Sequence, residues 1–236
     1  MKNSLREFRL AYFAQIFLSC LLYATVAFSQ TPPNTSEVLQ YSGLFKAVIE
    51  RDSLALKKNI SVTKNIDERD EYGRTALHVA AYTANHEAMR LLVKAGADPN
   101  ALEQDRYDIV TIAAVANDIE TLRLSLKLGA SARNITSRYD GTALIAAAHL
   151  GHVEVVQTLI LAGAPLDHVN NLNWTALIES IVLGDGGEHH TATLKALVEA
   201  GAKVNLADGY GRTPLTLARH NGYTNMVEIL RAAGAK

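Results

Sequence analysis

Residues 75–78 read Thr-Ala-Leu-His, and variants of this short stretch recur along the chain. Similar stretches, TALI, TALI and TPLT, begin at Thr142, Thr175 and Thr213, and a degenerate copy, DIVT, begins at Asp108. In every copy the first residue has a side-chain oxygen that can cap the start of a helix. Self-similarity at a nearly fixed period indicates a repeat architecture rather than a single globular core.

A glycine ends each repeated unit, and the spacings between these glycines are 33, 34, 38 and 33 residues. The five are Gly96, Gly129, Gly163, Gly201 and Gly234. Between cap and glycine the sequence predicts a short alanine-rich helix, such as LHVAAYT, then a turn and a second helix, such as HEAMRLLVKA. One such pair cannot bury its own apolar face, so neighbouring pairs must stack. The predicted fold is all-α, a solenoid of stacked helix pairs with hairpin-like tips.

This pattern resembles the ankyrin repeat over residues 70–236, through TALH at 75–78, GHVEVV at 151–156 and AGADPN at 95–100. Shifting back 33 residues from Leu77 reaches Leu44, where a helix pair without the TALH stretch is expected. The expected units are an N-terminal capping repeat at 37–69 and repeats at 70–102, 103–135 (degenerate), 136–169, 170–207 (with an enlarged loop) and 208–236 (C-terminal).

The N-terminal segment, residues 1–29, has the order of a secretory signal peptide. Lys2, Arg6 and Arg9 precede a long apolar run, and Ala27-Phe28-Ser29 offers small residues before Gln30. We therefore expect cleavage there, a flexible start at 30–36, and a periplasmic or secreted protein. The alternative is an uncleaved N-terminal helix that anchors the chain, because the apolar run approaches membrane-spanning length.

Composition narrows the class of protein. The formal net charge of −1 shows no basic excess, which argues against a nucleic-acid partner. Cys20 is the single cysteine and lies in the predicted signal peptide, so the mature chain would have no disulfide and no cysteine nucleophile. No nucleophile–base pair or metal-ligand spacing stands out. We expect no enzymatic activity and no cofactor.

The predicted tips carry aromatic and arginine side chains, the residue types most often found at binding hot spots. The residues are Tyr72, Arg74, Arg106, Tyr107, Arg138, Tyr139, Trp174, Tyr210 and Arg212. A side chain at such a position can instead pack on its neighbour, and both interpretations stay open for any single residue. The row as a whole favours a surface for a protein partner of unknown identity.

Residues 184–190, GDGGEHH, lie where the spacing lengthens to 38 residues, so they predict an enlarged loop between the two helices of one unit. The stretch lacks the Gly-Lys-Ser/Thr ending of a phosphate loop and the alternating oxygen ligands of a calcium loop. A transition-metal or small-ligand site built from Glu179, Asp185 and His190 remains the alternative.

Glu179 stands at a helix position where the other units carry apolar residues, so its carboxylate needs hydrogen-bond partners. The sequence suggests that it anchors the enlarged loop, together with Gly186, Gly187 and His190. Taken together, we expect an exported ankyrin-like scaffold, monomeric and free of the membrane after cleavage, that binds a protein partner through its concave edge. The alternative function is a metal- or small-ligand-binding regulator that uses the GDGGEHH loop.

Overall fold

The structure, a computed structural model, describes residues 31–236. The predicted signal peptide and its cleavage point therefore lie outside the described residues. The described part contains thirteen helices and no strand. None of these helices is both long enough and apolar enough to span a lipid bilayer.

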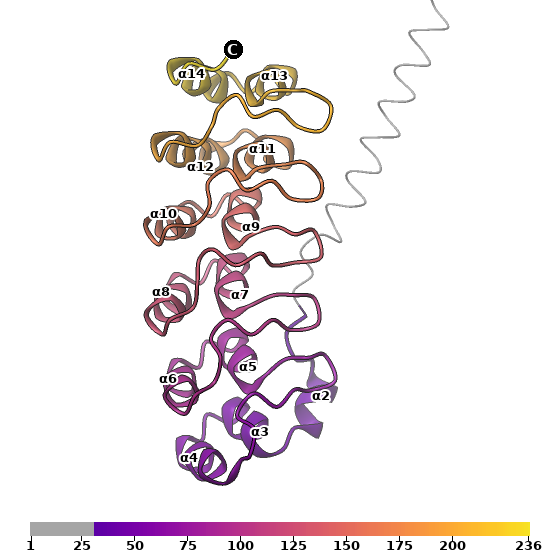
Figure 1. Cartoon of the computed structure of the whole chain (residues 1–236), viewed down its shortest axis with the longest axis vertical. Helices are drawn as coiled ribbons and strands as arrows, with labels where there is room; N and C mark the ends of the chain where they lie inside the picture. Colours follow the sequence, from indigo (N-terminus) through magenta and orange to yellow (C-terminus); the bar gives the residue numbers. More distant parts are fainter. Residues whose placement is uncertain (1–30) are drawn as a thin grey trace, which may run out of the picture. The chain divides into compact units, whose positions relative to one another are not determined.

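Six helix pairs stack one upon another along the chain, with a short additional helix at the start (Figure 1). The first helices form one layer, the second helices form the other, and the connections between pairs project to one side as hairpin tips (Figure 1). The additional helix is α2 (Thr35–Gln40), and the pairs are α3 (Gly43–Ile49) with α4 (Ser53–Val62), α5 (Ala76–Tyr82) with α6 (His86–Lys94), α7 (Ile109–Val115) with α8 (Ile119–Lys127), α9 (Ala143–His149) with α10 (Val153–Leu161), α11 (Ala176–Val182) with α12 (Glu188–Glu199), and α13 (Pro214–His220) with α14 (Thr224–Ala232).

The recurring Thr or Asp begins each first helix after the capping pair, as the sequence predicts. In α5, α7, α9, α11 and α13 its side-chain oxygen accepts a hydrogen bond from the main-chain N–H three residues later. These bonds satisfy donors that a helix start otherwise leaves unpaired. The predicted all-α solenoid of stacked helix pairs is confirmed.

Small side chains on the first helices allow close stacking. Ala146, Ala147 and Ala148 of α9 are fully buried between neighbouring units. His78 is also buried, and its Nε2 lies 3.0 Å from the carbonyl oxygen of Ala101 and 3.2 Å from that of Tyr107 in the next unit. Burial lowers the pKa of His78 to about 4, so this histidine is neutral and serves as a link between units.

Part of the segment expected to be a flexible start, from residue 31 onward, contacts the stack. Asn34 caps α2 with hydrogen bonds from the main-chain N–H groups of Ser36 and Glu37. The carbonyl oxygen of Thr31 accepts a hydrogen bond from Arg74. The helix lies on the tip side of the stack, beside the first pair (Figure 1). We call residues 31–42 the N-terminal arm.

The insertion at residues 184–190 is shared between a loop and a helix, which corrects the expectation of an enlarged loop alone. Five residues, 183–187, connect α11 to α12, whereas three, 150–152, connect α9 to α10. Helix α12 has 12 residues where α10 has 9, so Glu188, His189 and His190 form its first turn. The three extra helical residues amount to nearly one full turn of about 3.6 residues.

Candidate functional site at the hairpin tips

Each tip is held by a polar side chain that accepts main-chain N–H groups of the same turn. In the first tip, Asp70 Oδ1 accepts from the amides of Tyr72 and Arg74, both at 2.9 Å. Glu103, Ser137, Asn170 and Asp208 accept such bonds in the four tips that follow. These hydrogen bonds fix the backbone of each turn, and the fixed backbone sets where the side chains on the turn begin.

Main-chain hydrogen bonds also join the first four tips to one another. The amides of Gln104, Ser137 and Asn171 donate to the carbonyl oxygens of Tyr72, Arg106 and Tyr139 at 3.1, 3.1 and 3.0 Å. Two exposed ion pairs cross the middle of the row in opposite directions, Arg106 with Asp140 at 2.8 Å and Arg138 with Asp105. The first four tips therefore form one continuous edge rather than independent loops.

The nine predicted partner-binding residues divide into three groups in the structure. Tyr72, Arg106, Arg138 and Tyr210 are exposed, Tyr139 and Arg212 are half-buried, and Arg74, Tyr107 and Trp174 are buried. Each member of the last group directly precedes a capping residue, where the chain turns back into the helix layer. Burial there raises the pKa of Tyr107 to about 12. At these three positions the burial favours the interpretation that the side chain packs on its neighbours.

Arg74 is buried by the N-terminal arm, which sequence reasoning did not connect with it. Its Nε donates to Asp70 Oδ2 at 2.7 Å, its Nη1 donates to the carbonyl oxygen of Thr31 at 2.9 Å, and its Nη2 pairs with Glu37. Tyr41 donates its hydroxyl to the same Asp70 oxygen at 2.7 Å. Burial raises the pKa of Asp70, but the hydrogen bonds from Tyr41 and Arg74 outweigh it and hold the pKa below its usual value.

Two glycines of the GDGGEHH stretch are packed against aromatic rings, Gly184 against His190 and Gly186 against Tyr223. A Cβ on Gly186 would lie 2.3 Å from the Tyr223 ring of the next unit, and a Cβ on Gly184 would lie 2.8 Å from the His190 ring. The hydroxyl of Tyr223 donates to the carbonyl oxygen of Gly184 at 2.8 Å. Only glycine fits at these two positions, so the stretch is a structural contact between units.

His190 and Asp185 close this loop. Asp185 Oδ1 lies 2.9 Å from His190 Nδ1 and accepts from the amide of Gly187 at 2.8 Å. The other ring nitrogen, Nε2, lies 2.9 Å from the carbonyl oxygen of His149 in the preceding unit. The hydrogen bonds from Gly187 and His190 hold the pKa of Asp185 below its usual value. The structure therefore brings Gly186, Gly187 and His190 together.

Glu179 lies apart from that group and has other partners than the loop donors the sequence suggests. Its buried carboxylate accepts from Asn170 Nδ2 at 2.9 Å, and its Oε2 lies 3.3 Å from His149 Nδ1. It reaches the loop only indirectly, because His149 also contacts His190 through its carbonyl oxygen. Among residues 31–236, no three His, Cys, Asp or Glu side chains are gathered in a way that could hold a metal ion.

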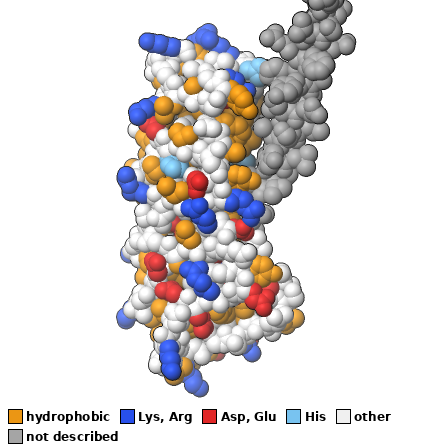
Figure 2. Space-filling view, turned by 45° about the vertical axis from the view of Figure 1, so that its right-hand side comes forward, with side chains coloured by type: hydrophobic (Ala, Val, Ile, Leu, Met, Phe, Trp, Pro, Cys, Tyr) orange, Lys and Arg blue, Asp and Glu red, His pale blue; other side chains and the backbone are white. Residues whose placement is uncertain are grey.

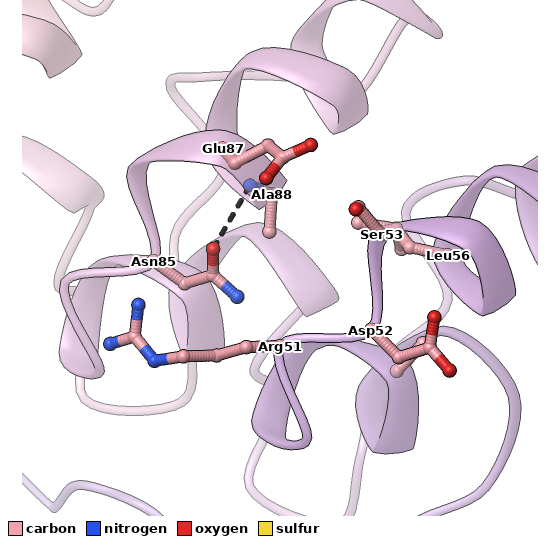
Figure 3. A pocket seen from close by; sticks show the side chains of 8 residues that line it. Arg51, Asp52, Ser53, Leu56, Asn85, Glu87 and Ala88 are labelled. Carbon is pink, nitrogen blue, oxygen red and sulfur yellow. Dashed lines mark hydrogen bonds between the residues drawn. The ribbon is translucent and has the colours of Figure 1, made fainter.

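A small hollow lies between α4 and α6 (Figure 3). Arg51, Asp52 and Asn85 line it, and Asn85 Oδ1 accepts from the amide of Ala88 at 3.1 Å (Figure 3). Its free volume is about 10 Å³, the lower limit for one water molecule. The polar groups here cap α4 and α6, and the space is too small for a metabolite.

Charges on the tip edge are mixed. The face in Figure 2 shows acidic and basic side chains interspersed with apolar ones. A nucleic-acid site normally carries a stripe of one positive sign. The mixed character of this face suits a protein surface instead.

Comparison with known families gives three matches along the chain. A family model described as ankyrin repeats (three copies) matches residues 110–208, a single ankyrin repeat matches residues 72–104, and a third, ankyrin repeats (many copies), matches residues 187–231. The ankyrin repeat protein YahD of Escherichia coli K12 is 33% identical over 181 residues, which are 76% of this chain and 90% of that protein.

Solved structures agree with this assignment. An ankyrin repeat domain from Acinetobacter baumannii is 44% identical, with a TM-score of 0.77, and the match covers 82% of this chain and 98% of that one. The ankyrin repeat domain of Bcl-3 is 27% identical, with a TM-score of 0.74, and the match covers 83% of this chain and 87% of that one.

Proposed function

The chain belongs to the ankyrin-repeat family, and on this premise we propose that it is an exported scaffold that binds a protein partner through its hairpin tips. Proteins of this family are in general non-enzymatic scaffolds for protein–protein interaction. The observation that carries the proposal is the edge itself. Tyr72, Arg106 and Arg138 are exposed on tips that hydrogen bonds hold in register, and Tyr210 is exposed on the last tip.

A rigid edge favours binding because its side chains lose little freedom when a partner docks. Tyrosine and arginine offer large contact areas and directional hydrogen bonds, and they often dominate the energy of an interface. The second helices provide a natural comparison surface. Leu161 on α10 is 88% exposed and lies in the other layer, away from the tips.

Export is the second part of the proposal. It is supported by Lys2, Arg6 and Arg9 ahead of the apolar run and by the small residues before Gln30. N-terminal sequencing of the protein isolated from its native cells should give a first residue near Gln30. A chain that still begins at Met1 and sediments with membranes would replace this part with an N-terminal anchor.

Site-directed photo-cross-linking in the native cells tests the binding edge. A photoreactive residue at position 106 or 210 should give a cross-linked partner protein, whereas the same residue at position 161 should give none. Partners captured equally at all three positions, or at 161 alone, would refute the tip edge. The tip edge would also be refuted if the protein co-isolates with a partner but gives no cross-link at positions 106 and 210.

A further inference from the structure

The first and last tips are built from nearly the same residues. Residues 70–75 read DEYGRT and residues 208–213 read DGYGRT. In both tips the arginine Nε donates to the aspartate Oδ2 at 2.7 Å. The guanidinium also lies over the tyrosine ring, at 4.6 Å in the first tip and 5.2 Å in the last. Each tip therefore orients an arginine against an aromatic face.

The first tip is occupied by the chain's own N-terminal arm. The carboxylate of Glu37 and the carbonyl oxygen of Thr31 take the two outer nitrogens of Arg74. The side chain of Arg74 is consequently only 1% exposed. This contact shows what kind of group the arginine of such a tip binds, namely a short polypeptide segment that offers a carboxylate and a main-chain carbonyl.

The last tip has no such covering segment among residues 31–236. The side chain of Arg212 is 40% exposed, and Tyr210 is 77% exposed. The neighbouring tip adds two exposed apolar side chains, Val169 and Leu172. The two tips lie close together, because a Cβ on Gly209 would lie 3.0 Å from Asn173 Nδ2. The edge thus offers an arginine and a tyrosine next to apolar side chains.

Charge also favours an acidic ligand at this end. The last unit, residues 208–236, holds more basic than acidic side chains: Arg212, Arg219, Arg231 and Lys236 against Asp208 and Glu228. Asp208 is already paired with Arg212. Arginine binds carboxylates through parallel N–H donors, and this bond is stronger than one between neutral groups.

We propose that the tip formed by Asp208–Arg212 binds an acidic segment of a partner protein, in the way that the first tip binds the N-terminal arm. A carboxylate of the segment pairs with Arg212, and an apolar side chain packs against Tyr210 and Leu172. This inference rests on the proposed function and adds to it the chemistry of the partner and the end of the stack that recognises it.

A peptide copy of the arm tests this assignment. The probe is a fluorescent peptide of residues 31–42, TPPNTSEVLQYS, titrated against the purified protein by anisotropy up to about 1 mM, where specific but weak binding is still measurable. Arg212→Ala should weaken binding by about fivefold or more, as truncation of a contact arginine does. Arg231→Ala, an exposed arginine of the same unit, should leave binding unchanged. A peptide with Gln in place of Glu37 should bind the original protein as weakly as the original peptide binds the Arg212→Ala variant.

Peptide binding that is equal in the Arg212→Ala and Arg231→Ala variants, or absent at the highest concentration, would overturn the inference. If the protein self-associates and Arg212→Ala abolishes that association, the occupant is the arm of a second copy, and the partner-protein assignment falls. A partner that cross-links at position 106 and is captured equally by Arg212→Ala would remove this inference while the proposed function stands.

Discussion

The tips at the two ends of the stack share five of six residues, yet the arginine of one is buried and that of the other is half exposed. Their internal hydrogen bonds are the same, with the amides at +2 and +4 donating to the aspartate at 2.9 Å in both. The local sequence therefore decides the turn. The environment of the arginine is decided by the N-terminal arm, which lies outside the repeated pattern.

The first end is consequently a closed structural cap, whereas at the last end no segment of residues 31–236 covers the arginine. The same side chain thus contributes to stability in one place and is available for recognition in the other. The variants below separate these two roles, because the matched residue at the other end serves as the control for each.

Arg74→Ala should give the largest effect. It leaves the carboxylates of Asp70 and Glu37, both mostly buried, without their cation. Removal of one partner from a buried ion pair costs about 3–5 kcal/mol of unfolding free energy. Arg212→Ala, at a half-exposed pair, should cost at most about 1 kcal/mol. Urea unfolding followed by circular dichroism measures both values. Equal losses at the two ends would mean that the arm does not close the first tip.

The pH dependence of stability should come next, and His78 in the first half should contribute to it. The pKa of His78 is about 4 when folded against 6.5 for the free side chain, because the ring is buried. The unfolded chain therefore binds a proton between pH 6.5 and 4 that the folded chain does not bind. Stability present above pH 6.5 is lost as pH falls to 4, by about 3 kcal/mol.

The matching position in the last unit holds Thr216, which does not titrate. His78→Gln should therefore flatten this part of the pH profile, measured as unfolding free energy from urea titrations at several pH values. Parallel profiles for the original protein and the variant would show that His78 is not buried neutral.

Glu37→Gln should have a smaller effect, about 1–2 kcal/mol, because the amide keeps one acceptor oxygen for Arg74 but removes the charge. Glu71→Gln is the matched control, since Glu71 is an exposed glutamate on the same tip. The difference in unfolding free energy between the two variants measures how much the arm stabilises the first end. Two equally small losses would place the stabilising contact elsewhere in the arm.

Tyr210→Ala should have the smallest effect on folding, below about 0.5 kcal/mol, because an exposed side chain loses few contacts. Thermal unfolding of this variant should follow that of the original protein. A marked fall in melting temperature would show that Tyr210 stabilises the last unit, and it would weaken the case for an open recognition surface there.

Most of the fold can be predicted from the sequence because each unit carries its own signals. Thr75, Thr142, Thr175 and Thr213 cap first helices as expected, and the recurring glycines end second helices. These signals act over a few residues, so a repeated pattern suffices to locate them.

The site is less predictable because its decisive contacts cross between units. Arg74 and Glu37 are 37 residues apart, and nothing in the arm repeats. Tyr107 and Trp174 look like surface aromatics until the chain is seen to turn inward at the residue before each cap. Glu179 contacts Asn170 and His149. Both partners stand at ordinary repeat positions, and nothing in the sequence indicates that they share a contact.

The arm also has a consequence for the order in which the chain folds. Its hydrogen bond to Arg74 spans 43 residues, and the contact of His190 with His149 spans 41, so each joins units that are close in sequence. In a stack each folded unit templates its neighbour. The closing contact at the first end can therefore form once residue 74 has been synthesised, well before the last tip exists. Within residues 31–236 the last tip has no covering segment, and there we expect the folded stack to begin to open.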